Sequence, residues 1–225
     1  MQLDFQAREV TVKLVYYGPA LSGKTTNLQA IHRLLNPEGR GRLMTLETRD
    51  DRTLFFDLLP LTINTDMGIT VRIKLFTVPG QVIHNSTRRL VLQGADGVAF
   101  IADSQVNEVR ANQASFKDLR RNLRENGIDP GVMPIVIQYN KRDLPNIRSE
   151  GDIMRMASQG KERTFLATAT HGIGVVDTFL GLIASAFEHL EAQHALSQRF
   201  GLTYQEVQRD LKQRFTNAAE APRHG

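Results

Sequence analysis

The sequence predicts an α/β fold built on a three-layer, doubly wound and mostly parallel sheet with one antiparallel strand. Three observations lead to this prediction. Strand-like and helix-like segments alternate along the 225 residues. The run at 97–102 is wholly apolar, as expected of a central parallel strand that helices cover on both faces. A glycine-rich loop at 18–25 joins the first strand to the first helix.

The loop at residues 18–25 reads G-P-A-L-S-G-K-T and matches the phosphate-binding pattern G-x-x-x-x-G-K-[ST]. Residues 10–17 before it are rich in β-formers, and residues 24–35 after it carry apolar side chains at helical spacing. The motif requires this strand-loop-helix context. We therefore interpret the loop as a phosphate cradle rather than as a glycine-rich turn that matches by chance.

Several residue types in this loop suit a nucleoside polyphosphate. Gly18 and Gly23 permit a bend whose backbone N–H groups turn inward on an anion, and the following helix N-terminus adds partial positive charge. Lys24 is placed to reach the β- and γ-phosphates, and the Thr25 hydroxyl to ligate Mg²⁺. The residues expected to line the phosphates are Gly18, Ala20, Ser22, Gly23, Lys24, Thr25 and Thr26.

The composition is that of an ordinary globular protein, with 41% hydrophobic and 23% charged residues. The net charge is +4 and the charges are scattered, which favours a solvated surface over a nucleic-acid-binding patch. The chain has no cysteine, which excludes disulfides, thiolate zinc sites and cysteine-linked lipids. No run approaches a membrane span in length, and the N-terminus lacks an apolar signal core. We therefore expect a cytoplasmic protein with no membrane span and no nucleic-acid partner.

The rest of the chain continues the alternation of strands and helices. Residues 36–53, rich in Gly, Arg, Asp and Thr, are predicted to form a mobile loop. The segments 54–61 and 69–76 are predicted to pair as a hairpin that turns near residues 66–68. The other predicted elements are helices at 107–125, 150–158 and 174–196, and strands at 132–139 and 164–167.

A second motif, N-K-R-D at 140–143, follows the buried strand at 132–139 and indicates which base is bound. The Asp143 carboxylate can accept hydrogen bonds from the N1–H and amino groups of guanine, whereas adenine offers no such pair of donors. Asn140 can reach N7, and the Lys141 stem can cover the base. Four residues alone form a weak pattern, usually a polar loop. The strand before them and their distance from the phosphate loop favour guanine recognition.

The run T-V-P-G-Q at 77–81 ends the second hairpin strand, where small GTPases carry D-x-x-G-Q. Gly80 fits a backbone N–H that senses the γ-phosphate, and Gln81 fits the side chain that orients the attacking water. A plain Pro-Gly turn is the alternative. Thr77 departs from the pattern, which has at this position an Asp that holds Mg²⁺ through a water molecule. Asp57, on the neighbouring strand, is the nearest carboxylate that could replace this Asp. The alternative is that Asp57 is a solvent-facing strand residue.

Five motifs in this order give the chain a resemblance to the MglA family, the bacterial Ras/Arf-like GTPases of cell polarity and gliding motility. The resemblance covers residues 8–195 approximately, and the Thr at position 77 is itself typical of the family. The matching runs are the phosphate loop with T-T-N-L at 25–28, D-R-T-L-F-F-D at 51–57, T-V-P-G-Q at 77–81, A-D-S-Q at 102–105 and Q-Y-N-K-R-D-L-P at 138–145. The resemblance implies the P-loop small-GTPase fold of the Ras type.

The resemblance also implies roles for residues in the segment 51–57. Thr53 corresponds to the switch Thr that closes on Mg²⁺ and the γ-phosphate. The expected metal set is then Thr25, Thr53 and Asp57. Arg52 corresponds to an arginine finger supplied in cis, whose charge would stabilise the phosphoryl oxygens in the transition state. Without the family, an ordinary loop arginine is the simpler interpretation of Arg52.

A last set of base contacts is implied by the family. Thr168 and Ala169 occupy the loop that small GTPases place against the base, and the Ala169 N–H is expected to meet the guanine carbonyl. Thr170 stands where that loop usually has Lys, so the chain departs from the pattern at this position.

The function that the resemblance implies is a molecular switch that binds GTP with Mg²⁺ and hydrolyses it slowly to GDP. Loss of the γ-phosphate releases two switch segments near 40–56 and 77–90. A roadblock-domain partner of the MglB type is expected to accelerate hydrolysis by reshaping the switches, without inserting an arginine of its own. Polarity or motility effectors and MreB-like filaments are the other partners that the family implies. The implied location is the cytoplasm, including a cell pole.

Two other functions remain open at this point. A guanine-nucleotide-bound scaffold with negligible hydrolysis is kept open by Thr77, whereas Gln81 and Arg52 favour the switch. An ATP-dependent metabolic kinase is disfavoured by Asn140 and Asp143, which suit guanine.

The chain is predicted to divide into a small GTPase domain at 1–195 and a helical extension at 196–225 with a disordered tail from residue 216. Thr203 and Glu206 form a capping-box pattern, and an apolar stripe follows on one helical face. The stripe consists of Tyr204, Val207, Leu211 and Phe215. Packing on the chain's own domain is the favoured interpretation, and a partner-binding helix is the alternative.

Overall fold

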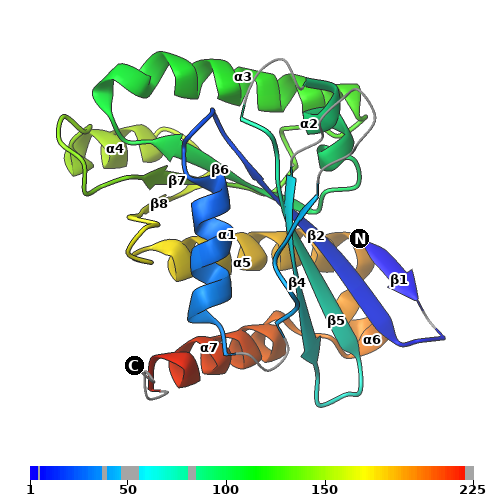
Figure 1. Cartoon of the computed structure of the whole chain (residues 1–225). Coiled ribbons are helices and arrows are strands. Elements are labelled where there is room, and N and C mark those ends of the chain that lie inside the picture. Colours follow the sequence, from blue (N-terminus) through cyan, green and yellow to red (C-terminus); the bar gives the residue numbers. More distant parts are fainter. Residues whose placement is uncertain (5, 37–39, 47–55, 81–84, 221–225) are drawn as a thin grey trace.

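The computed structural model describes residues 1–4, 6–36, 40–46, 56–80 and 85–220. These residues form a mixed, mostly parallel sheet of eight strands with helices on both faces (Figure 1). The strand order is β3-β4-β5-β2-β6-β7-β8, and β1 pairs with β2 outside this path. This arrangement confirms the predicted α/β fold with its Ras-like order of elements.

The centre of the sheet is β2 (Glu9–Tyr17), the strand that leads into the phosphate loop. It pairs in parallel with β5 (Thr70–Thr77) along one edge and with β6 (Gly97–Asp103) along the upper part of the other edge. The short strand β1 (Gln2–Asp4) covers the lower part of that second edge in antiparallel register. The N-terminal amine contacts the Asp96 carboxylate just before β6, which ties β1 to the sheet.

The antiparallel part of the sheet is the predicted hairpin, formed by β4 (Phe56–Asn64) and β5. A further strand, β3 (Met44–Leu46), pairs with the start of β4. It lies inside the segment 36–53 that the sequence predicts as a loop, so that prediction is wrong at residues 44–46. Backbone pairing with the free edge of β4 holds these residues, and three residues are too few to show a strand periodicity.

Most of the other elements lie close to where the sequence predicts them, but the helices Asn85–Leu92 and Leu196–Phe200 were not predicted. The parallel strands are completed by β7 (Ile135–Asn140) and β8 (Arg163–Leu166). The helices are α1 (Lys24–Leu34), α2 (Asn85–Leu92), α3 (Val109–Glu125), α4 (Glu150–Ala157), α5 (Val175–His194), α6 (Leu196–Phe200) and α7 (Tyr204–Glu220), with a 3₁₀ turn at Val106–Glu108. None of these helices is long and apolar enough to cross a membrane.

The sheet separates two apolar cores, and β2 contributes to both because its side chains alternate between faces. Leu14 and Tyr16 lie in the core beneath α1, α5 and α7. Val15 and Tyr17 lie in the opposite core beneath α2 and α3. Figure 1 shows α2 and α3 on one side of the sheet and α1, α5 and α7 on the other. The phosphate loop therefore starts from a strand whose last four residues, before the loop, are all buried.

The extension beyond residue 195 shares the first of these cores. Val207 and Leu211 are fully buried in it, and the ring of Phe215 meets Phe179 of α5 edge-on at 6.0 Å between centroids. The predicted capping box is present, because the Thr203 backbone N–H donates to Glu206 Oε2 at 3.2 Å. The apolar stripe thus packs on the chain's own domain. α7 continues through residues 216–220, so the prediction of a disordered tail from residue 216 is wrong at these five residues.

Candidate functional site

The predicted ligand-binding motifs meet at one edge of the sheet. β2, β5, β6 and β7 run parallel, so the loops that follow them lie side by side at their carboxyl ends. A Cβ added to Gly23 would lie 2.2 Å from the Asn140 amide, and one added to Gly80 would lie 2.4 Å from Ala20 Cα. The phosphate loop, the run at 77–80 and the base motif are therefore in direct contact.

The phosphate loop needs its glycines for shape and for space. Gly18 and Gly23 have φ of +152° and +96°, in the region that disfavours other residues. A Cβ on Gly18 would lie 2.2 Å from the Ile101 carbonyl oxygen on β6. Gly23 ends the loop as the N-cap of α1, so the free N–H groups of the helix start face the loop. The backbone of the loop thus forms a cradle with the glycine geometry and helix N-terminus that anion binding requires.

Lys24 lies inside this cradle with 6% of its surface exposed. Its ammonium donates to the carbonyl oxygens of Pro19 and Gly18 at 2.6 and 3.1 Å. Burial and the nearby Arg88 charge, against an opposing effect of Asp57, together lower the pKa of Lys24 to about 7. Phosphate charge at the loop would favour the protonated ammonium, because an opposite charge raises a lysine pKa.

Asp57 is buried beside Thr25 rather than turned to solvent. Its Oδ2 accepts hydrogen bonds from the hydroxyls of Thr25 at 2.6 Å and Thr77 at 3.0 Å. Its Oδ1 accepts from the Thr45 hydroxyl at 2.9 Å, and its backbone N–H donates to Thr77 Oγ1 at 2.8 Å. The strand pairing of β4 with β5 therefore places a carboxylate where Thr77 supplies none.

This donor set fits a magnesium ion that also binds phosphate oxygens. Mg²⁺ prefers oxygen ligands and is usually held by one or two carboxylates or hydroxyls together with phosphates and waters. Thr25 and Asp57 supply one hydroxyl and one carboxylate within hydrogen-bond distance of each other. In the part of the chain that the structure describes, no cluster of three acidic or histidine side chains could hold a metal without a nucleotide.

Asn140 joins the base motif to the phosphate loop. Its side chain is 2% exposed, and its Nδ2 donates to the Ser22 carbonyl at 2.9 Å. Its Oδ1 accepts from the Ala169 backbone N–H at 2.9 Å, so the N–H that the sequence assigns to the guanine carbonyl bonds to Asn140 here. Thr168 is also buried and begins the turn that carries Ala169, with its N–H on the Ile173 carbonyl.

Lys141 and Asp143 take up different positions in the same motif. The Lys141 ammonium bonds to Asp103 Oδ2 at 2.6 Å, which stretches its stem across the end of β6. Asp143 is exposed, and within the described residues its carboxylate has no hydrogen-bond partner. It is thus free to accept hydrogen bonds from a ligand. Asp103 was not predicted as a site residue, although an acid at the carboxyl end of a buried strand is a recognisable signal.

The floor of the site contains buried polar side chains from the phosphate loop, α1, β7 and α5. Gln138 of β7 is fully buried and donates to Asn27 of α1 at 3.0 Å and to Thr178 of α5 at 2.8 Å. Ser22 is fully buried within the loop, and Thr26 is half-buried on the first turn of α1. These contacts link α1 and α5 to the strand that carries the base motif.

The proposed catalytic and switch side chains belong to segments that the structure does not describe. Arg52, Thr53 and Gln81 lie outside the described residues. The residue before Gln81 is described, and Gly80 lies against Ala20 of the phosphate loop. The structure therefore describes the residues proposed to bind the phosphates and the base, together with Thr25 and Asp57 of the proposed metal site. The sequence adds Arg52, Thr53 and Gln81 as further candidates.

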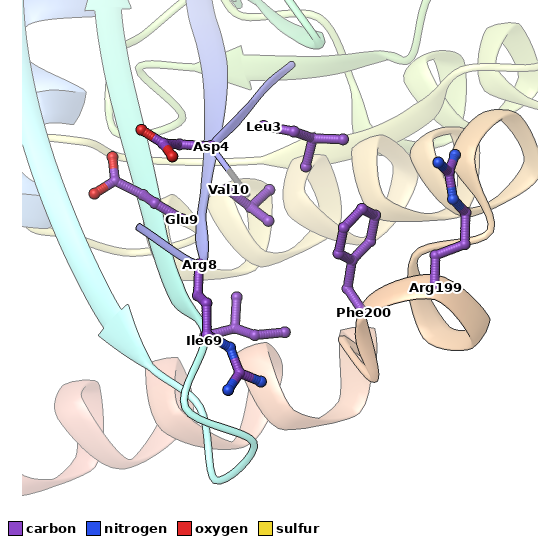
Figure 2. A pocket seen from close by; sticks show the side chains of 8 residues that line it. All are labelled: Leu3, Asp4, Arg8, Glu9, Val10, Ile69, Arg199 and Phe200. Carbon is purple, nitrogen blue, oxygen red and sulfur yellow. The ribbon is translucent and has the colours of Figure 1, made fainter. Parts of the chain in front are cut away.

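A cavity of about 480 Å³ lies elsewhere, beside β1, the start of β2 and α6. Figure 2 shows its apolar side chains between the acidic side chains on one side and Arg199 on the other. Its lining residues are Leu3, Asp4, Arg8, Glu9, Val10, Ile69, Arg199 and Phe200. Glu9 already pairs with Arg72, and Arg8 bonds to the Met67 carbonyl. This cavity lies at the amino ends of the parallel strands, away from the nucleotide motifs.

Comparison with known proteins identifies one curated relative over most of the chain. No protein-family model matches. The chain is 47% identical over 176 residues to the mutual gliding-motility protein MglA of Myxococcus xanthus (strain DK1622). The matched region covers 78% of this chain and 90% of that relative. Sequence identity at this level over nearly the whole relative indicates that the two chains share a fold and belong to one family.

Proposed function

The chain belongs to the MglA family of small GTPases involved in gliding motility, and from this premise we propose that it is a GTP-hydrolysing switch. In this proposal it binds GTP with Mg²⁺, hydrolyses it slowly to GDP, and signals through the segments near 40–56 and 77–90. The observation that carries the proposal is the hydrogen bond between Asn140 and Ser22, which joins the base motif to the phosphate loop at 2.9 Å. A site of this span suits a guanine nucleotide with its phosphates.

Mg²⁺ fits the oxygen donors at the start of α1 and β4. Thr25, Thr53 and Asp57 are the residues proposed to hold it, and Thr77 orients Asp57 through its hydroxyl. When bound, the ion would offset the negative charge that develops on the phosphate oxygens during hydrolysis. Lys24 supplies a second positive charge from inside the loop.

The proposed chemistry is in-line attack of water on the γ-phosphorus. The new bond joins the water oxygen to phosphorus, and the bond to the β–γ bridging oxygen breaks, which leaves GDP and inorganic phosphate. Gln81 is proposed to orient the water, Arg52 to stabilise the growing negative charge, and the Gly80 N–H to bind a γ-phosphate oxygen. The position of Gly80 against the phosphate loop supports the last assignment.

The proposed partners follow from the family. We expect a roadblock-domain protein of the MglB type to accelerate hydrolysis by reshaping the switch segments, without inserting an arginine of its own. Polarity or motility effectors, with MreB-like filaments among them, would bind the GTP form. The proposed location is the cytoplasm, with a cell pole as the place where a polarity switch would act.

The test is a time course of GTP hydrolysis with and without a purified roadblock-domain protein from the same genome. Gln81→Leu and Arg52→Ala should keep GTP binding and lose most of the stimulated hydrolysis, since neither alters the ground-state phosphate contacts. Lys24→Ala should instead weaken binding itself. Parental rates in both of the first two variants would contradict the mechanism.

A scaffold that binds GTP without hydrolysing it is the second candidate, suggested by the missing acid at Thr77. Asp57 lies 3.0 Å from the Thr77 hydroxyl, which restores a carboxylate to the metal site and favours the switch. A single-turnover measurement on the GTP complex separates the two. Retention of all bound γ-phosphate over hours, even with the partner, would support the scaffold.

A further inference from the structure

We propose that Arg88 is a positioning residue for γ-phosphate recognition, which holds the peptide between Pro79 and Gly80 in the orientation that GTP requires. This inference rests on the proposed function as a GTP switch. Arg88 belongs to α2, and its side chain is 1% exposed, the largest side chain among those fully buried in the described residues. No sequence motif points to it.

All three nitrogens of the Arg88 guanidinium donate hydrogen bonds. Its Nε donates to the Pro79 carbonyl at 2.9 Å, and its Nη2 donates to the Gly80 carbonyl. Its Nη1 donates to Asp118 Oδ2 on α3 at 2.7 Å. The rigid fork of arginine can bind two successive carbonyls and a carboxylate together, which the single ammonium of lysine cannot do with the same geometry.

The grip on Pro79 determines the direction of the next N–H. No peptide bond in the described chain is cis, so the Pro79 carbonyl and the Gly80 N–H point to opposite sides of one planar unit. With the carbonyl held by Arg88, the Gly80 N–H points away from α2. Gly80 itself lies against the phosphate loop, where a Cβ would come within 2.4 Å of Ala20 Cα. Arg88 therefore presents this N–H to the phosphate side of the site.

The same network reaches the start of the phosphate loop. Asp118 Oδ2 also accepts from the Tyr17 hydroxyl at 2.5 Å, and Asn122 donates to that hydroxyl at 3.0 Å. Tyr17 directly precedes Gly18. Burial, with the Asp118 hydrogen bond, raises the pKa of Tyr17 far above its usual range, so it remains a donor. One carboxylate on α3 thus anchors both the first residue before the loop and the arginine that holds Gly80.

A purely structural role for Arg88, joining α2 to α3, makes a different prediction. GTP and GDP share every group except the γ-phosphate, and the Gly80 N–H is the group proposed to contact it. Loss of a structural brace would change the affinities for GTP and GDP alike. Loss of a positioning residue would change the affinity for GTP more than the affinity for GDP.

The experiment compares Arg88→Lys with the parental protein, measuring dissociation constants for GDP and for a slowly hydrolysed GTP analogue in Mg²⁺. The positioning role predicts that the ratio of GTP to GDP affinity falls about tenfold, the loss expected for one charge-assisted hydrogen bond. An unchanged ratio would overturn the proposal. Arg89→Lys is the matched control, because Arg89 is the next residue of α2 and is 55% exposed.

A second variant keeps the test decisive if Arg88→Lys does not fold. Tyr17→Phe removes one hydroxyl from the Asp118 carboxylate and leaves the packing of the ring. It should lower the same affinity ratio by a smaller factor, with the GDP affinity kept, and an unchanged ratio would then count against the network. If the parental protein itself binds no guanine nucleotide, the proposed function fails. If it binds and hydrolyses GTP while the variants keep the parental ratio, only the role of Arg88 fails.

Discussion

The carboxylate proposed for the metal site belongs to Asp57, on the strand beside Thr77, where small GTPases carry an Asp. Thr77 takes the usual place and donates its hydroxyl to Asp57 Oδ2 at 3.0 Å, while Asp57 returns a backbone N–H to Thr77. The two side chains form a reciprocal cross-strand pair. Thr25 reaches the same carboxylate oxygen at 2.6 Å. The exchange keeps one acid and one hydroxyl at the site.

We predict that the proposed metal-binding carboxylate can be moved from position 57 on β4 to position 77 on β5. Asp57→Ala should speed nucleotide release in Mg²⁺ and remove most of the further effect of a chelator, since no carboxylate remains to hold the ion. The double change Asp57→Thr with Thr77→Asp should recover much of the chelator effect, because it exchanges the two side chains of one pair. Release of a fluorescent GDP with and without EDTA measures both. If Asp57→Ala kept the parental response of GDP release to EDTA, Asp57 would be excluded from the metal site.

Asp143 leads to a prediction about base selectivity. Asp143→Asn should lower GDP affinity roughly 10²–10⁴-fold, because two charge-assisted hydrogen bonds at about 1.5–3 kcal/mol each are lost. It should raise affinity for xanthosine diphosphate, since the amide offers one donor and one acceptor to that base. Competition against labelled GDP measures the change. Equal displacement of GDP by ATP from the parental protein would contradict guanine recognition itself.

The residues that sequence motifs predict and those that they miss differ in how they work. Lys24 and Asn140 sit in short local patterns, and the structure brings them to the same edge of the sheet. Asp103 and Arg88 act through contacts with residues far along the chain, such as the bond from Lys141 to Asp103. Local spacing carries no information on such pairs. Asp57 falls between these two groups. The predicted hairpin identified it as the nearest acid to Thr77, but the sequence did not show its hydrogen-bond partners.

At the scale of elements, length accounts for much of what the sequence could predict, although α2 and α4 have 8 residues each and only α4 was predicted. The long helices α3 and α5 and the buried strand β6 show clear periodicity or an apolar run, and the structure confirms them. β1 and β3 have 3 residues each and α6 has 5, which is too short for a period to show. Backbone pairing and the N-terminal amine, rather than side-chain pattern, position β1.

The extension helix α7 connects elements that carry the site. It packs on α5, α1 and β4, and the backbone N–H of Asn36, just after α1, donates to the Arg214 carbonyl at 3.1 Å. Thr25 lies at the start of α1, and Asp57 near the start of β4. The helix therefore packs on the two elements whose N-terminal ends carry the proposed metal ligands Thr25 and Asp57.

Leu211→Ala should destabilise the protein by about 2–5 kcal/mol, because Leu211 is fully buried and its truncation leaves a cavity. For a chain of this length each kcal/mol corresponds to about 2–4 °C in Tm. Gln213→Ala is the control on the same helix, since Gln213 is exposed. Thermal unfolding of the GDP form measures both. Equal melting temperatures for the two variants would mean that the extension does not pack on the domain in solution.

For the whole molecule, the parallel topology determines where a nucleotide binds. The sheet order places the loops after β2, β5, β6 and β7 at one end, and the hydrogen bonds of Asn140 and Lys141 join three of those loops. The alternation of elements made this order predictable. The positions of Arg52, Thr53 and Gln81 stay predictions, since these residues lie outside the described part of the chain.

Because separate loops form the site, bound nucleotide should stabilise the entire domain. A ligand at about 1,000 times its Kd adds about 4 kcal/mol to the free energy of unfolding when it binds only the folded state. GDP with Mg²⁺ should therefore raise Tm on the order of 10 °C. ATP at the same concentration should leave Tm unchanged, because Asp143 finds no pair of donors on adenine. Lys24→Ala should show a smaller GDP shift at the same concentration, since weaker binding lowers the ratio of ligand to Kd. A GDP shift no larger than the ATP shift would show that the described framework does not recognise guanine.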